Sequence, residues 1–274
     1  MKNILDVKMP FELTQDDLER VSCPICENDS NENHFELKIN GVSFYLAYCK
    51  IDDLWWVNPR PPASYYKRLY EEVFYSSPCP DHFGYASHEK DGERRRLKAA
   101  KNIDDIEKYI SNENRNSFFE IGCASGELLE EVLSRGWNVA EGVEIDKECC
   151  DNAIKKGLSI YEGFFESINF NDKKYNIIFS DNVIEHVLNP DLVFKTCRNL
   201  QSKGNLLIFR LPDTQHPGPT LKLIDHTYHY TRTSITKIFE KYGYKVIDII
   251  YSGTYLSEDK LHEIKNMTII GEKT

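Results

Sequence analysis

Apolar and amphipathic segments alternate through the second half of the chain, and this alternation predicts the fold class. Short apolar runs typical of buried strands occupy residues 118–121, 137–143, 158–161, 175–180 and 205–211. Helical patterns follow the first, second and fourth of these runs. Strands that alternate with helices are typical of a parallel sheet covered by helices. A helix over 234–242 and strands over 245–251 and 265–270 would then close the sheet with an antiparallel hairpin.

The first third of the chain has a different pattern. Residues 35–48 alternate between apolar and polar positions around a turn at Gly41, which predicts a β-hairpin. Helical spacing follows over residues 63–74 and 92–110. We therefore expect three units: a small β domain over 1–62, a helical segment over 63–111 and an α/β domain over 112–274.

The segment between the two early helices, residues 75–91, is a long loop rich in Tyr, His, Pro and Ser. Loops of this length are often lids or binding segments. Tyr75, His82 and Tyr85 are candidates to line a pocket, and packing of these rings between domains is an equally good alternative. A second long loop is expected over 212–231, where His216, His226 and His229 lie.

Composition narrows the function. The 274 residues are 41% hydrophobic and carry a net charge of -10. This charge argues against a large nucleic-acid footprint, which needs clustered basic residues. The one basic cluster is Arg94-Arg95-Arg96 with Lys98 and Lys101, on one predicted helix. No apolar run approaches a membrane span, and the first residues lack the apolar core of a signal peptide, so we expect a cytoplasmic protein.

A glycine turn follows the strand at 118–121 and reads Glu120-x-Gly122-x-Ala124-x-Gly126. The next strand ends at the acidic pair Glu144 and Asp146. A turn and helix N-terminus beside such an acid form a nucleoside half-site, in which the carboxylate takes the ribose hydroxyls. Glu144 is the preferred acid, because it lies nearer the end of the strand. The G-x-G-x-x-G spacing of dinucleotide sites is absent from this turn.

The turn resembles the first motif of class I S-adenosylmethionine-dependent methyltransferases, E/D-x-G-x-G-x-G, with Ala124 for the middle glycine. The resemblance implies a Rossmann-like seven-stranded sheet and S-adenosyl-L-methionine as cofactor. By the same resemblance, Phe164 and Phe165 would wall the adenine, Asp181 and Asn182 would lie near the sulfonium, and an arginine of 94–96 would meet the methionine carboxylate. The implied cofactor-binding residues are Glu120, Gly122, Cys123, Ala124, Gly126, Glu144, Ile145, Phe164, Phe165, Asp181, Asn182 and Val183.

Residues 181–187, DNVIEHV, resemble the motif that follows the fourth strand in this family, and residues 226–230, HTYHY, resemble a later H-x-x-H-Y segment. Histidine suits the removal of a proton from a hydroxyl near neutral pH. His186 is the first candidate for the general base, His226 and His229 come second, and Glu185 would orient a histidine or share the proton. A variant assisted by Mg or Mn is a further alternative.

Cys23-Pro-Ile-Cys26 and the later Cys49-x-x-Asp52 have the spacing of a zinc-ribbon-like site. The flanking Asn58-Pro-Arg-Pro61 resembles the end of the N-terminal zinc-binding domain of bacterial sugar and surface-glycan methyltransferases. Zinc would be held by Cys23, Cys26, Cys49 and either Asp52 or His34, or the site is degenerate and metal-free. We expect the remaining cysteines to be buried thiols; they are Cys79, Cys123, Cys149, Cys150 and Cys197.

Three functions are therefore compared. The leading one is O-methylation of a sugar, either nucleotide-activated or part of a glycan such as a surface polysaccharide. The second is methylation of RNA, which the acidic balance disfavours. The third is a non-catalytic module that only binds S-adenosylmethionine. The oligomeric state does not follow from the sequence.

Overall fold

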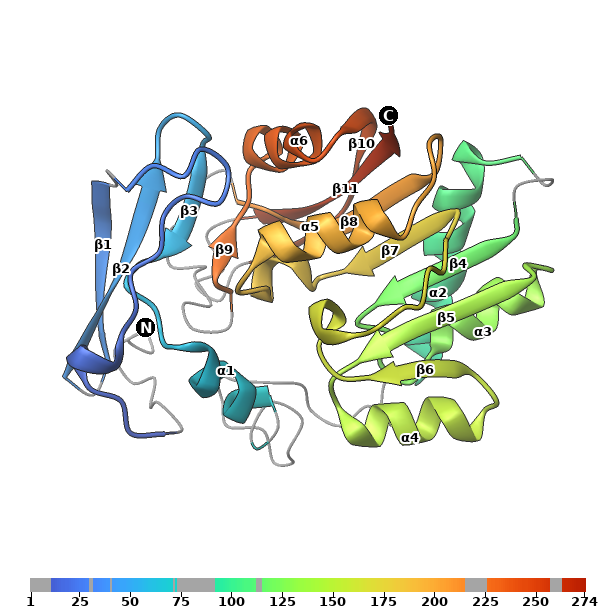
Figure 1. The fold of residues 1–274 in the computed structure, drawn as a ribbon, viewed down its shortest axis with the longest axis horizontal. Coiled ribbons are helices and arrows are strands. Elements are labelled where there is room, and N and C mark those ends of the chain that lie inside the picture. The colour runs from blue at the N-terminus through green and yellow to red at the C-terminus, as the bar shows by residue number, and fades with distance from the viewer. Residues whose placement is uncertain are drawn as a thin grey trace.

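The computed structural model describes residues 11–29, 32–39, 41–70, 72, 92–111, 115–214, 226–256 and 263–274. The predicted lid residues, Cys79 and His216 lie outside these ranges, and so does the side chain of His34. Within the described residues no helix is long and apolar enough to cross a membrane. Two sheets organise the chain, as Figure 1 shows.

The large sheet has seven strands in the order β10-β11-β8-β7-β4-β5-β6. Its strands are β4 (Ser117–Ile121), β5 (Val139–Glu144), β6 (Ser159–Glu162), β7 (Ile177–Asp181), β8 (Leu206–Asp213), β10 (Tyr244–Leu256) and β11 (Glu263–Lys273). The pairs from β6 to β8 are parallel, while β11 pairs antiparallel with both β8 and β10. The predicted α/β class and its closing hairpin are thus confirmed.

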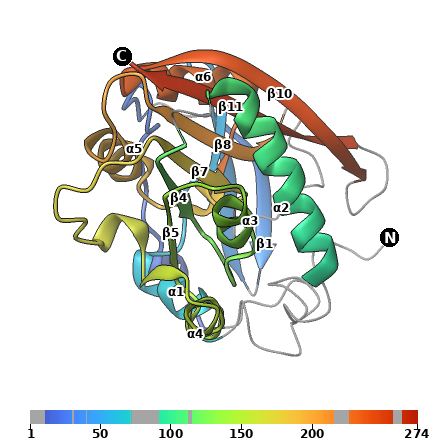
Figure 2. The same ribbon diagram turned by 90° about the vertical axis from the view of Figure 1, so that its right-hand side faces the viewer.

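Helices cover both faces of this sheet, because successive strand residues point to opposite sides. Phe118 and Phe119 of β4 are both fully buried, one in each core. Phe118 packs with α2 (Gly92–Ile106) and α3 (Glu127–Ser134), and Phe119 packs in the core of α5 (Pro190–Asn199) and α6 (Arg232–Lys241). Figure 2 shows α2 and α3 on one face and α5 on the other. The remaining helix, α4 (Lys147–Lys155), connects β5 to β6 in the chain.

The small sheet has the order β1-β2-β3-β9. Its strands are β1 (Glu32–Ile39), β2 (Val42–Cys49), β3 (Leu54–Val57) and β9 (Tyr228–His229). The first two form the predicted hairpin. β9 comes from the far end of the chain and pairs with β3, Trp55 opposite His229. The small sheet therefore draws on residues of both the first and the third predicted units.

Two elements differ from the prediction. The expected loop over 212–231 begins inside β8 and contains β9, because pairing with β3 satisfies the backbone of a segment whose polar sequence gives no strand signal. The helix expected over 92–110 ends as α2 at Ile106 and continues as a 3₁₀ turn, Glu107–Tyr109. The described part of the helix expected over 63–74 begins with α1 (Ala63–Leu69), and most of the remainder lies outside the described ranges.

Candidate functional site

The glycine turn between β4 and α3 is pinned to the end of β5. The backbone amides of Gly122 and Cys123 donate to the carbonyl of Val143 at 2.9 and 3.1 Å. Gly122 and Gly126 have φ of +74° and +82°, the left-handed region that favours glycine. A Cβ at Gly126 would lie 2.2 Å from Leu158 Cδ1. The turn can thus approach its neighbours only with glycine at these two positions.

Ala124 stands where the family pattern has its middle glycine, and it also takes a left-handed conformation, with φ of +47°. An alanine there is strained. Its amide donates to Glu144 Oε2 at 2.8 Å, which holds the strained residue in place. The departure from the motif is therefore accommodated in the same backbone geometry.

Glu144 ends β5 and is buried beside this turn. Its Oε1 accepts hydrogen bonds from the amides of Ile145 and Asp146 at 2.7 and 3.0 Å. Burial raises the pKa of Glu144, while its three backbone donors oppose that shift. Asp146 instead caps α4, because its Oδ1 accepts from the Cys149 amide at 2.7 Å. The carboxylate fixed next to the turn is that of Glu144.

A cavity of about 940 Å³ lies at the carboxyl ends of the parallel strands. Figure 1 shows the arrowheads of β4, β5 and β7 pointing toward α1 and the small sheet, which face them across this region. All of the expected cofactor-binding residues line the cavity except Gly126, which ends the turn and packs against Leu158. Residues of α1 and α2 complete the wall, among them Tyr66, Arg94 and Arg95, together with Tyr70, which follows α1.

The floor of the cavity is acidic. Glu120 is buried, and its Oε2 has no hydrogen-bond partner among the described residues. Burial raises the pKa of Glu120 well above its ordinary value, and the nearby charges of Asp181, Glu127 and Glu144 raise it further. A buried acceptor without a partner is costly. A cationic or hydrogen-bond-donating ligand in the cavity would supply that partner.

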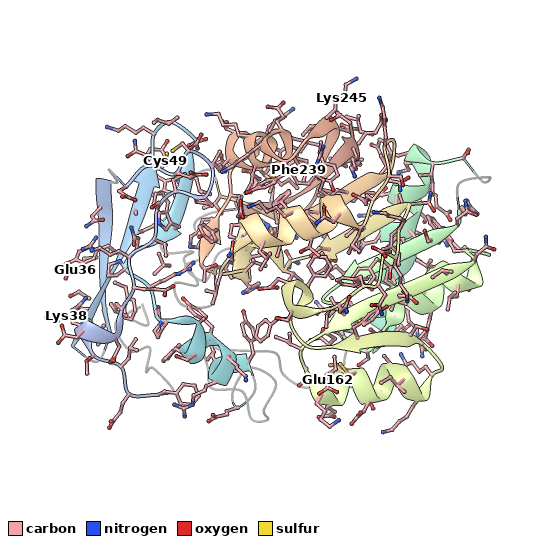
Figure 3. The ribbon with its side chains drawn as sticks, in the orientation of Figure 1. Glu36, Lys38, Cys49, Glu162, Phe239 and Lys245 are labelled. Carbon is pink, nitrogen blue, oxygen red and sulfur yellow. The ribbon has the colours of Figure 1, made fainter. Side chains whose placement is uncertain are left out.

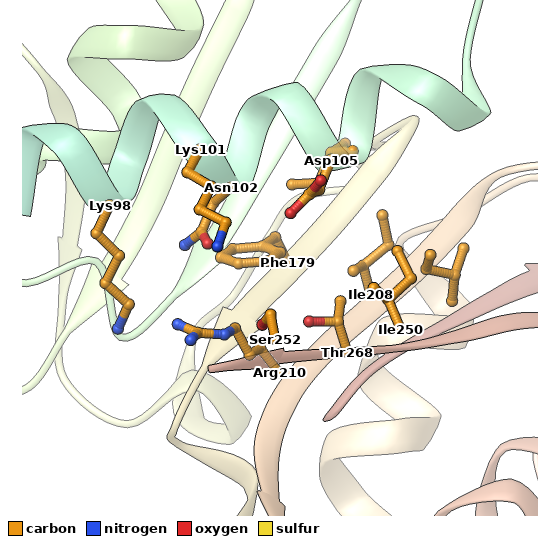
Figure 4. A pocket seen from close by; sticks show the side chains of 12 residues that line it. Lys98, Lys101, Asn102, Asp105, Phe179, Ile208, Arg210, Ile250, Ser252 and Thr268 are labelled. Carbon is orange, nitrogen blue, oxygen red and sulfur yellow. The ribbon is translucent and has the colours of Figure 1, made fainter. Parts of the chain in front are cut away.

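Asp181, at the end of β7, is held by its own protein partners. Lys98 Nζ lies 2.8 Å from its carboxylate, Arg210 Nη1 lies 3.2 Å from both oxygens, and Asn102 donates at 3.2 Å. Figure 4 shows Lys98 and Asn102 on α2, with Lys98 extending toward Arg210. The sequence prediction missed these three partners. The sequence could have indicated Arg210 as a site residue, because it lies near the carboxyl end of a predicted strand.

The two phenylalanines after β6 have different environments. Both line the cavity, but Phe165 is buried and its ring lies 5.8 Å from that of Phe119 in the core. Phe164 is only partly buried. Phe165 therefore supports the wall from the core side, and Phe164 is the more available of the two rings.

The three described candidate histidines lie together. The rings of His186 and His226 are 4.6 Å apart and edge-to-face, and His229 lies 6.0 Å beyond His226. Of these, only His186 lines the cavity. Ligand atoms of Glu185, His186 and His226 lie within 4.8 Å of one another, a spacing that suits proton transfer or a divalent cation.

His229 differs from the other two because it is buried, and its Nε2 has no hydrogen-bond partner among the described residues. Burial, with a smaller contribution from His186, lowers the pKa of His229 to about 3. It therefore stays neutral near pH 7 and binds a proton weakly. Among the three histidines, its environment suits a general base least.

The expected metal ligands also come together. One ligand atom each from Cys23, Cys26, Cys49 and Asp52 lies within 4.8 Å of the others. Burial, followed by the hydrogen bond to Asp52, raises the pKa of Cys26 to about 11. Lys237 Nζ of α6 lies 3.2 Å from Asp52 Oδ1. Figure 3 shows Cys49 at the end of the small sheet nearest α6. Of the other cysteines, Cys123, Cys149, Cys150 and Cys197 are buried, as expected.

The sheet order, the glycine turn and the acid beside it define the class I fold of S-adenosylmethionine-dependent methyltransferases. Such an enzyme from Archaeoglobus fulgidus superposes with a TM-score of 0.52 and 17% identity, over 68% of this chain and 98% of the other. One from Clostridium acetobutylicum gives 0.50 and 15%, over 68% and 96%. Identities this low show a shared fold.

A family model described as a methyltransferase domain matches residues 92–249, more than half of the chain. The chain therefore belongs to this methyltransferase family and is an enzyme. An uncharacterized protein of Methanocaldococcus jannaschii is 24% identical over 94 residues, which is 34% of this chain and 43% of that protein.

Proposed function

We propose that the protein transfers a methyl group from S-adenosylmethionine to a sugar hydroxyl, in the cavity at the strand ends. One observation carries the proposal: a single cavity joins the glycine turn and Glu144 to His186. When bound, the cofactor supplies an activated methyl group on its sulfonium. The residues of the chain bind and align the two reactants and take the proton of the acceptor.

The chain offers groups for each part of the cofactor. Glu144 would accept hydrogen bonds from the ribose hydroxyls, and the ring of Phe164 would cover the adenine. Arg95 lies on the cavity wall, its Nη1 3.6 Å from Glu127, and would meet the methionine carboxylate. Glu120, with its unpartnered buried oxygen, would face the cationic ammonium.

His186 is the proposed general base, because it is the one candidate histidine on the cavity wall. Its imidazole would accept the proton of the acceptor hydroxyl as the oxygen bonds to the methyl carbon. Glu185 is buried beside it and would orient the ring. His226, whose ring lies 4.6 Å from that of His186, would assist the proton transfer.

The sugar acceptor rests on the resemblance of the N-terminal segment and of the histidine segment to methyltransferases of glycan pathways. The cavity extends beyond the expected cofactor residues to Tyr66 and Lys67 of α1 and to Tyr70, which follows α1. These residues leave a wall for a second reactant. Aromatic rings with polar tips suit the alternating apolar and hydroxyl faces of a sugar. Biosynthesis of a surface polysaccharide is the process that this acceptor would serve.

We also propose a structural zinc ion held by Cys23, Cys26, Cys49 and Asp52, a closed set of four ligands. The cluster lies apart from the residues that line the cavity, so zinc would stabilise the small sheet. Metal analysis of the purified protein should give about one zinc per chain, and Cys49→Ser should lose it. Zinc-free protein with an unchanged melting temperature would contradict this role.

The test of the proposed function is the formation of S-adenosylhomocysteine, with separate pools of nucleotide-linked sugars, free metabolites and total RNA as acceptors. We expect turnover with the sugar pool and a loss of about 100-fold or more in His186→Ala, the usual size of a general-base effect. Added Mg²⁺ or Mn²⁺ should leave the turnover unchanged when His186 acts as a base.

Parallel variants rank the histidines in this assay. Smaller losses are expected in His226→Ala and in His229→Ala, because neither side chain lines the cavity. Turnover with RNA alone would contradict the proposed acceptor. Full activity of His186→Ala would contradict the assignment of the base.

A further inference from the structure

The two segments that carry His186 and His226 are far apart in the chain. His186 ends a 3₁₀ turn, Ile184–His186, that follows β7. His226 precedes β9, whose backbone pairs with β3 of the small sheet. Because the rings meet edge-to-face at 4.6 Å, their spacing depends on what joins these segments.

Thr227, the neighbour of His226, makes the most direct connection. It is fully buried, and its hydroxyl lies 3.1 Å from the carbonyl of Glu185 and 2.9 Å from that of Val187. These two carbonyls flank His186 in the chain, and either can accept a hydrogen bond from the hydroxyl. The carbonyl of Thr227 accepts the amide of Val57 at 3.1 Å, which anchors the same residue to β3.

Arg60, from the Asn-Pro-Arg-Pro segment, makes a second connection. Its buried guanidinium donates from Nη1 to the carbonyl of Leu188 at 3.0 Å and to the hydroxyl of Tyr228 at 3.3 Å. Its Nε donates to Glu19 at 2.9 Å, which holds the guanidinium in one orientation. Arg60 thus contacts the chain two residues after His186 and two residues after His226.

We propose that Thr227 and Arg60 are positioning residues that set the distance between His186 and His226. This inference rests on the proposed roles of the two histidines in methyl transfer. It gives the small N-terminal unit a part in catalysis, because Arg60 and β3 reach the histidines through these contacts. Proton transfer and alignment are sensitive to displacements of about 1 Å, so loosening either contact lowers turnover.

Thr227 offers a nearly isosteric test. Thr227→Val keeps the volume and removes the donor, whereas Thr227→Ser keeps the donor. Tyr244→Phe is the matched control, because it also removes a buried hydroxyl bond, from Tyr244 to Gln201 at 2.8 Å, but away from the cavity. Two readouts are taken: kcat together with the Kd for S-adenosylmethionine, and the imidazole NMR signals of His186 and His226.

The expected result is a fall in kcat of about tenfold or more in Thr227→Val, with the cofactor Kd changed by less than about twofold. Thr227→Ser should recover most of the activity, and Tyr244→Phe should match the wild type. The two imidazole signals should shift in Thr227→Val and stay in place in Tyr244→Phe. Arg60→Lys should lose less turnover than Arg60→Met, since it retains one donor.

Equal kcat values and equal imidazole signals in Thr227→Val and Tyr244→Phe would overturn the inference. So would a fall in kcat matched by an equal loss of cofactor affinity, which indicates general unfolding. A wild type without turnover on any acceptor would contradict the proposed function, and the NMR comparison would then decide the positioning role on its own.

Discussion

Glu120 shows how burial changes a single residue. Its carboxyl is enclosed at the cavity floor among three other acids, and its pKa is raised well above the ordinary value. The buried group therefore stays protonated at a pH where an exposed glutamate is ionised. In the unfolded chain the same carboxyl titrates near its ordinary pKa of 4.5.

This difference predicts a pH-dependent stability. As the pH rises above about 4.5, the unfolded chain ionises Glu120 and the folded chain does not, so the free energy of unfolding falls by up to about 1.4 kcal/mol per pH unit. Glu120→Gln removes this contribution. Urea unfolding without cofactor should show the variant gaining stability relative to wild type as the pH rises from 5 to 7, by at most about 1.4 kcal/mol per pH unit.

Glu162→Gln is the control, because Glu162 is exposed at the edge of the sheet and should show no such gain. A stability difference between Glu120→Gln and wild type that is constant with pH would show that Glu120 ionises in the folded protein.

At this scale the sequence predicts the position of a residue where spacing along the chain determines its contacts. Glu144 was preferred over Asp146 as the acid beside the turn, and the structure fixes its carboxylate against Ala124. The environment of Asp181 could not be predicted in this way. Its cationic partners come from α2 and β8, and only the folded sheet brings them to it.

At the scale of elements, the strand-turn-helix unit depends on close contact between the turn and its neighbours. Gly126 and Gly136 both have positive φ, +82° and +84°. A Cβ at Gly126 would meet Leu158, whereas a Cβ at Gly136 would meet nothing within 4 Å. Alanine substitutions at the two positions therefore separate the cost of backbone strain from the cost of a steric clash.

Gly136→Ala should therefore lower the free energy of unfolding by about 1–2 kcal/mol, the cost of an alanine in the left-handed conformation. Gly126→Ala should lower the free energy of unfolding by the same strain and by about 1–3 kcal/mol more, because the added methyl group overpacks the contact with its neighbours. It should also weaken cofactor binding, because the turn must shift. Denaturant unfolding and cofactor titration of both variants measure these effects. Equal losses in the two variants would contradict the packing argument.

Elements with strong periodicity were predicted from the sequence, and those defined by distant pairing were not. The apolar run and glycine turn around β4 predicted their strand and turn directly. β9 has two residues and exists because Trp55 and Trp56 of β3 lie beside it. No local pattern contains that information.

At the scale of the molecule, the two sheets are joined beside the cavity at the strand ends. α6 contacts the cysteine cluster through Lys237, and the Thr231 hydroxyl donates to the Asp53 carbonyl at 2.8 Å. β9 completes the small sheet and carries His229. The sequence predicted the large sheet and the hairpin of the small sheet, but the pairing of β9 with β3 needed the three-dimensional structure.

The central claim is that this cavity binds S-adenosylmethionine with Glu144 at the ribose. Calorimetric titration of S-adenosylhomocysteine into wild type, Glu144→Gln and Asp146→Ala tests it most directly. We predict one site in the wild type, an affinity about tenfold or more weaker in Glu144→Gln, and a nearly unchanged affinity in Asp146→Ala, which loses only a helix cap. No binding to the folded wild type, or equal affinity in Glu144→Gln, would contradict the account.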